Sequence, residues 1–130
     1  MSLELFAVDW DYTHSFYLKK DQIARVKVDK GLSYKLAGEL FFRWTLFVNE
    51  GLVVLLKYEG FPHQYVLYKK WGRDTIRLVI DKKPSKEWLE SYLLIKFEDF
   101  DPKRKVAVLK VFVANPPKNL DVSFIDPKRK

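Results

Sequence analysis

Residues 40–58 read LFFRWTLFVNEGLVVLLKY, and this stretch decides the fold class. Apolar side chains occupy every second position from Leu40 to Val48, and a second apolar run follows the segment 49–51, Asn-Glu-Gly. Period-two alternation is typical of a β-strand with one buried face, and a short turn between two such runs is typical of a hairpin. The stretch therefore predicts two antiparallel strands joined by a tight turn.

The same alternation extends through most of the chain and predicts an all-β protein of about nine to ten strands. The first strand of the central hairpin is expected to extend over residues 33–48. Other strands are expected at residues 6–18, 24–28, 65–71, 75–81, 92–98, 105–113 and 120–125. Residues 59–64 are expected to form a loop. One short helix is expected near 85–91, where Ser85 is a suitable N-cap and Glu87 suits the positive helix end.

Two architectures fit this order of strands. Successive hairpins favour a meandering β-barrel, whereas the long connection at 81–92 and the proline-containing loop at 114–119 favour strands that change sheets. We therefore expect an antiparallel β-sandwich, with the barrel as the alternative. Residues 1–125 are expected to form one domain, followed by a basic C-terminal tail at 126–130.

Composition excludes several classes of protein. The chain has 130 residues, of which 48% are hydrophobic, so it is not intrinsically disordered. It has no cysteine, which excludes disulfides, cysteine metal sites and a cysteine nucleophile. Few amide and sulfur residues beside abundant lysine, arginine and glutamate make the composition thermophile-like. The start of the chain lacks the pattern of a signal peptide, so a cytoplasmic location is expected.

Catalytic patterns are absent from the sequence, and we expect a protein that is not an enzyme and needs no cofactor or metal. His14 lies in a predicted strand and is expected to be a half-buried histidine, while His63 is expected in a solvated loop. An acidic turn at 98–101 is expected to be solvated, because it lacks the spacing of a calcium loop. Trp88 is expected to anchor the short helix to the sheet.

The registers of the predicted hairpins point to basic outer faces. If each loop has three residues and ends at a glycine with positive φ, Gly31 and Gly51, then Arg25 faces Lys35 and Arg43 faces Lys57. In the same register Val26 pairs with Tyr34, Trp44 with Leu56 and Phe47 with Val53. A third hairpin, formed by 65–71 and 75–81, places Arg77 opposite Lys70 or Lys69.

Like charges that face each other are unfavourable, so their presence favours binding to an anion. The formal net charge is +7, and the excess lies entirely in residues 66–130. We therefore expect a non-enzymatic module that binds a polyanion, with nucleic acid as the first candidate, on a basic and aromatic sheet surface. The expected cationic residues are Arg25, Lys27, Lys35, Arg43, Lys57, Lys70 and Arg77. The expected stacking residues are Tyr17, Phe41, Phe47 and Trp71.

Two other functions fit the sequence. The outer face of the hairpin at 40–58 is expected to carry Phe41, Phe47, Val53 and Leu55, an apolar surface that a second copy of the chain could cover in a homo-oligomer. The third alternative is a β domain that binds a small molecule or a sugar in a pocket lined by aromatic side chains. The sequence predicts no association with a membrane.

Overall fold

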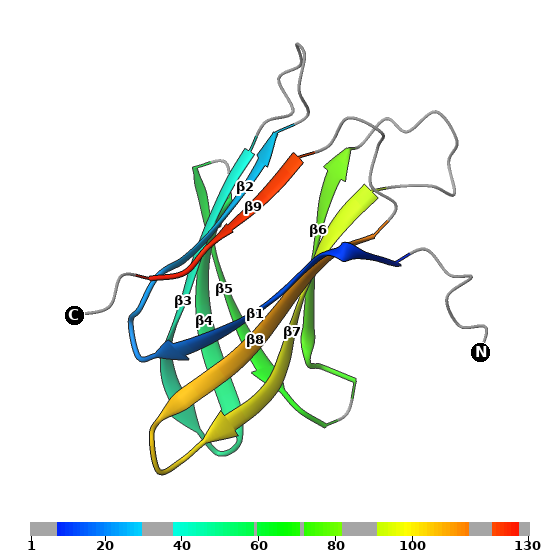
Figure 1. The fold of residues 1–130 in the computed structure, drawn as a ribbon. Helices are drawn as coiled ribbons and strands as arrows, with labels where there is room; N and C mark the ends of the chain where they lie inside the picture. Colours follow the sequence, from blue (N-terminus) through cyan, green and yellow to red (C-terminus); the bar gives the residue numbers. More distant parts are fainter. Residues whose placement is uncertain are drawn as a thin grey trace.

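The computed structural model of the protein describes residues 8–29, 38–58, 60–70, 72–81, 91–114 and 121–127. This part of the chain contains nine strands and no helix (Figure 1). The strands are β1 (Val8–Lys19), β2 (Ala24–Asp29), β3 (Gly38–Val48), β4 (Gly51–Tyr58), β5 (Phe61–Tyr68), β6 (Thr75–Asp81), β7 (Ser91–Asp101), β8 (Val106–Ala114) and β9 (Asp121–Ile125). The predicted helix at 85–91 lies outside the described residues except for Ser91, which is the first residue of β7. Gly31, Lys35, Trp71, Trp88 and the tail beyond 127 also lie outside them.

The strands form two antiparallel sheets that pack face to face, as Figure 1 shows. The four-stranded sheet has the order β1-β8-β7-β6, and the five-stranded sheet has the order β5-β4-β3-β2-β9. The expected β-sandwich is therefore confirmed, and the alternative of a closed barrel is wrong.

Alternation along the strands accounts for the core between the sheets. Leu40, Phe42 and Trp44 point inward from β3 and are almost fully buried. Leu52, Val54 and Leu56 do the same from β4, and Ala107 to Val113 provide every second residue from β8. The intervening residues face outward. One continuous apolar core thus receives side chains from both sheets.

A bulge in each sheet interrupts the alternation and changes which side chains point inward. The register of β3 against β4 shifts at Thr45, and that of β7 against β8 shifts at Glu98. A bulge adds one residue to a strand, so the residues beyond it reverse their facing. Phe47 consequently turns inward and stacks on Phe100, with ring centroids 4.0 Å apart. The expectation that Phe47 lies outward, opposite Val53, is wrong for this reason.

The turn between β3 and β4 also differs from the expected three-residue loop. Val48 pairs with Gly51, so only Asn49 and Glu50 form the loop, with φ of 53° and 67°. Two left-handed residues are typical of the two-residue hairpin turn whose twist matches that of the strands. Gly51 itself does not have positive φ. The shorter loop shifts the register by one residue, and the bulge at Thr45 shifts it by one more, so Trp44 pairs with Val54 rather than Leu56.

The expected register of β2 against β3 differs from the observed one by a larger amount. Arg25 pairs with Phe41 and Lys27 with Glu39, so the connection reaches to residue 37 instead of closing after three residues. The expected pairs Val26–Tyr34 and Arg25–Lys35 are excluded by this register. Gly38 is the first residue of β3 and pairs with Val28.

The segment 59–74 has a different organisation from the one expected. Residues 61–68 form strand β5 rather than a loop followed by a strand. The next strand, β6, belongs to the other sheet and pairs with β7, so β5 and β6 are not a hairpin. Arg77 accordingly faces Leu94 and not Lys69 or Lys70. Leu67 and Ile76 are both buried, and the crossing lets each strand pack into the core from its own side.

Candidate functional site

Four of the seven predicted cationic residues lie together on the outer face of the five-stranded sheet. Arg25 and Lys27 come from β2, Arg43 from β3 and Lys57 from β4. They share this face because they alternate with the buried residues of the same strands. The structure therefore brings together basic residues that are up to 32 positions apart along the chain.

An aromatic ring lies between two of these cations. Phe41 pairs with Arg25 on one side and with Lys57 on the other. The guanidinium carbon of Arg25 lies 5.2 Å from the centroid of the Phe41 ring, a distance typical of a cation–π contact. The same line of pairing continues to β9 and β5. We call this line the Phe41 row; its members are Ile125, Arg25, Phe41, Lys57 and Pro62.

Acidic side chains offset two of the four cations. Arg25 donates a hydrogen bond from Nη2 to Oε2 of Glu39 at 2.6 Å, and Arg43 donates from Nη1 to Oδ1 of Asp21 at 3.2 Å. Lys27 and Lys57 are exposed, and neither has an ion-pair partner among the described residues. The face therefore keeps an excess of positive charge that is centred on its two lysines.

The expected like-charge pairs do not exist on this face. Arg43 lies opposite Leu55, and Lys57 lies opposite Phe41. Lys27 lies opposite Glu39, which carries the opposite charge. The cations lie on neighbouring strands, but no two of them face each other. Repulsion between facing like charges is therefore absent here and does not favour anion binding on this face.

The same face also carries apolar side chains that contact solvent. Leu46 and Val48 are about half exposed because the bulge at Thr45 turns them outward. Ile23, before β2, and Val66, on β5, are exposed to a similar degree. A shallow hollow of about 780 Å³ lies over β3, β4 and β5. It is lined by Ile23, Phe41, Phe42, Arg43, Leu55, Leu56, Lys57, Pro62, His63 and Gln64.

The other predicted binding residues lie elsewhere. Arg77 is on the outer face of the four-stranded sheet, with its guanidinium carbon 4.2 Å from the Tyr92 ring centroid. Lys70 lies in the turn after β5, and Tyr17 is on β1 of the four-stranded sheet. Phe47 is in the interior. Lys35 and Trp71 lie outside the described residues.

One like-charge pair that the sequence did not predict is present on the four-stranded sheet. Lys96 of β7 faces Lys110 of β8.

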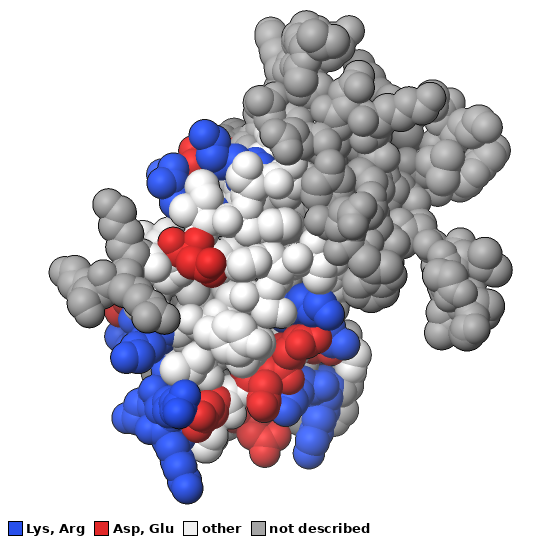
Figure 2. Space-filling model, viewed as in Figure 1, with Lys and Arg blue, Asp and Glu red and all other residues white. Residues whose placement is uncertain are grey.

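Figure 2 shows that the basic side chains on the viewed face of the molecule lie in separate groups with acidic side chains between them. This face therefore does not form one continuous basic surface.

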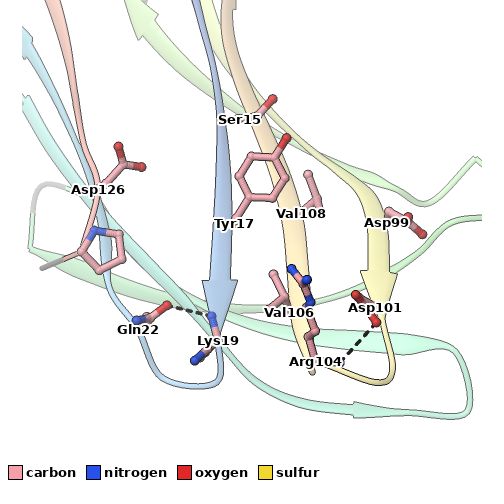
Figure 3. Close-up of a pocket in the computed structure, with 11 residues that line it drawn as sticks. Ser15, Tyr17, Lys19, Gln22, Asp99, Asp101, Arg104, Val106, Val108 and Asp126 are labelled. Carbon is pink, nitrogen blue, oxygen red and sulfur yellow. Dashed lines mark hydrogen bonds between the residues drawn. The ribbon is translucent and has the colours of Figure 1, made fainter. Parts of the chain in front are cut away.

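A second hollow, of about 860 Å³, lies beside Tyr17 (Figure 3). Tyr17 is 67% exposed and projects over Val106 and Val108 of the neighbouring strand. Asp101 at its rim accepts hydrogen bonds from the backbone N–H groups of Lys103 and Arg104 through Oδ1. This carboxylate therefore serves to hold the turn between β7 and β8.

Asp99, also at this rim, is the one described group with a clear shift in pKa. Its carboxylate accepts a hydrogen bond from Nζ of Lys69 at 3.1 Å. That bond, a backbone hydrogen bond at Phe100 and the charge of Lys69 hold the pKa of Asp99 below its ordinary value of 3.8. The contact ties the turn after β5 to β7, so it joins the two sheets.

His14 is half-buried, as expected, and has partners that the sequence did not indicate. Its Nε2 lies 3.0 Å from Oδ1 of Asp126, and its ring stacks on Phe124 with centroids 5.3 Å apart. Asp126 is the first residue of the expected basic tail, and its carboxylate contacts β1 through His14. His14 and His63 belong to different sheets, and the described residues contain no group of three or more potential metal ligands.

The described part of the chain also contains no helix that is long and apolar enough to cross a membrane. No protein-family model matches the sequence, and no curated protein or solved structure matches the chain.

Proposed function

We propose that the protein is a non-enzymatic module that binds single-stranded nucleic acid on the outer face of its five-stranded sheet. The observation that carries this proposal is the Phe41 row, in which an aromatic ring lies between an arginine and a lysine on three adjacent strands. Proteins that bind single strands without sequence preference combine aromatic side chains for base stacking with cations for the backbone. A cytoplasmic site of action is part of this proposal.

The dimensions of the row suit one stacked base flanked by phosphates. Neighbouring strands lie about 4.8 Å apart, so Arg25 and Lys57 are separated by roughly 10 Å on either side of Phe41. A base can stack on the combined surface of the Arg25 guanidinium and the Phe41 ring. Lys27 and Lys57, which have no acidic partner among the described residues, are then the contacts to the backbone.

The binding experiment is fluorescence anisotropy with a labelled 20-mer single strand and with the matching duplex. Each phosphate contact on a single strand contributes about −0.7 to the slope of log affinity against log salt. Lys57→Gln should therefore reduce the slope by about 0.7, whereas Phe41→Ala should weaken binding without changing the slope. Loss of one stacked base corresponds to about 1–3 kcal/mol.

Lys103→Gln provides the matched control. It removes one exposed lysine from the turn between β7 and β8 and leaves the proposed face unchanged. Equal effects of Lys57→Gln and Lys103→Gln would show that net charge alone attracts the strand. Absence of binding at low salt and micromolar protein would reject the proposal.

A second candidate function is association with another copy of the chain through the same outer face. Leu46, Val48 and Val66 favour it, because these large apolar side chains are about half exposed on one surface. Leu46→Ser with Val48→Ser would then lower the apparent mass in solution while leaving nucleic-acid binding intact.

The third candidate, a site for a sugar or another small molecule, corresponds to the hollow beside Tyr17.

A further inference from the structure

Strand β5 is an edge strand without a charged side chain. It reads FPHQYVLY and lies at the end of the five-stranded sheet, next to β4. In the described part of the chain, no strand pairs with its other edge. Each of the other edge strands, β1, β6 and β9, contains at least one aspartate, and charges on an edge oppose pairing with another chain.

The hydrogen bonds around β5 show which of its backbone groups face away from the sheet. The backbone N–H of Tyr68 donates to the carbonyl of Arg73 at 2.9 Å, so it points away from β4. The direction of backbone groups alternates along a strand, and no bulge interrupts the pairing of β5 with β4. The N–H groups of Gln64 and Val66 therefore point to the free edge, and so does the nitrogen of Pro62, which carries no hydrogen.

Two copies of this edge complement each other when they meet antiparallel. If Tyr65 lies on the two-fold axis, Gln64 pairs with Val66 of the partner subunit, and Val66 pairs with Gln64 of the partner subunit. The N–H groups of Gln64 and Val66 in both subunits, four in all, then each donate to a carbonyl of the residue paired with them in the other subunit. Pro62 falls opposite Tyr68 of the partner subunit, so the two positions that cannot donate face each other.

We propose that two copies of this chain pair through β5, in this register, to form a continuous ten-stranded sheet. The inference is independent of the proposed nucleic-acid function, because it uses the edge of the sheet rather than the cations on its face. The charge pattern fits a second copy of the chain: each chain carries +7, but the pairing brings no charged side chain of β5 against another. A C2 contact of this kind is isologous, as in most homodimers.

The oligomeric state tests the pairing. Sedimentation equilibrium at 0.15 M salt should show a species of twice the 15.5 kDa chain mass. Val66→Pro removes an N–H that points to the free edge of β5, so it should raise the midpoint concentration for dimer formation by about tenfold or more, since two hydrogen bonds are lost per dimer. Val66→Thr keeps the N–H and the shape of the side chain, and it should leave the midpoint within about threefold.

Cysteine cross-linking tests the register, because the chain contains no cysteine of its own. Gln64 and Val66 are both exposed on the outer face, so Gln64→Cys and Val66→Cys leave the core unchanged. A mixture of the two variants should form a disulfide-linked dimer on mild oxidation. Each variant alone should form at least about fivefold less, because identical positions lie diagonally, beyond the Cα separation that a disulfide spans.

Three results would contradict the proposed dimer or its register. A monomer at all concentrations, or a dimer that Val66→Pro leaves unchanged, would overturn the proposal. Efficient cross-linking of Gln64→Cys alone would place residue 64 on the two-fold axis and overturn the register. If Val66→Pro does not fold, Gln64→Lys gives the same test, because it brings two ammonium groups near each other across the axis and should raise the midpoint severalfold.

Discussion

The indole Nε1–H of Trp44 donates a hydrogen bond to the backbone carbonyl of Leu18 at 2.8 Å, inside the protein. Trp44 belongs to the five-stranded sheet and Leu18 to the four-stranded sheet. The bond therefore joins the two layers, and the backbone N–H of Asp21 reinforces it by donating to the carbonyl of Trp44 at 2.9 Å. One side chain thus combines apolar burial with a directional contact between the sheets.

Replacement of Trp44 tests both contributions. Trp44→Ala should lower the free energy of unfolding by about 3–5 kcal/mol, because it removes a large buried ring. Trp44→Phe keeps a ring but leaves the Leu18 carbonyl without its donor, which costs about 1–3 kcal/mol. Urea denaturation measures both values. Val48→Ala, at an exposed position of the same strand, should change stability by less than about 0.5 kcal/mol.

The turn between β3 and β4 should be open to stabilisation. Glu50 has φ of 67°, where a side chain with a Cβ is strained and glycine is not. Glu50→Gly should therefore raise the free energy of unfolding by about 0.5–1 kcal/mol. Asn49→Gly should gain less, because asparagine tolerates the left-handed region. Destabilisation by Glu50→Gly in thermal melts would show that the turn is not of this type.

Gly51 should resist substitution because of its neighbour rather than its backbone. A Cβ added there would lie 2.8 Å from Cε1 of Tyr68, so the ring would have to move. Gly51→Ala should cost about 1 kcal/mol in the natural sequence. In a Tyr68→Ala background the same change should instead stabilise, because alanine is favoured over glycine within a strand. Equal effects in both backgrounds would exclude this contact as the cause.

The pKa of Asp99 gives an expected pH dependence. Its pKa is lower in the folded protein than in the unfolded chain, so the contact with Lys69 is fully stabilising above the ordinary value of 3.8 and is lost as the pH falls through the lower, folded value. Asp99→Asn should therefore lower the melting temperature slightly at pH 6, and the difference from the natural protein should shrink below pH 3.8. Lys69→Gln should show the same trend. A difference that is constant with pH would contradict the assignment.

The alternation of apolar residues was enough to predict the all-β class and the burial of residues such as Trp44 and Leu56, while the long connections at 81–92 and 114–119 indicated the sandwich. It was not enough to predict the bulges, because period two alone places Leu46 inward and Phe47 outward. A signal was nevertheless present: Trp44 and Phe47 are three residues apart, and so are Phe97 and Phe100. The four rings form a chain of contacts, in which Trp44 packs on Phe100, Phe100 on Phe47 and Phe47 on Phe97. Without the bulges, residues three apart on one strand would point to opposite faces of the sheet.

The candidate site was predicted only in part for a related reason. Membership of Arg25, Lys27, Arg43 and Lys57 in one face follows from alternation along adjacent strands. The ion pairs of Arg25 with Glu39 and of Arg43 with Asp21 depend on how the strands align, which loop length controls. Strand β6 belongs to the other sheet, and this separates Arg77 from the group. Which sheet a strand joins depends on tertiary packing, which the local pattern of residues does not indicate.

The pairing of β1 with β8 and of β2 with β9 affects how the protein is made. Phe16 lies beside Leu109, and Val26 lies beside Phe124, so β1 and β2 cannot complete their hydrogen bonds until β8 and β9 have left the ribosome. Strands β3, β4 and β5 can form a meander much earlier, because each pairs with the next. Contacts this distant in sequence are typical of slow folding, on a scale of milliseconds to seconds. During synthesis, the residues of the β3–β5 meander therefore leave the ribosome before β6, β7 and β8, the strands of the other sheet that pack against its inner surface.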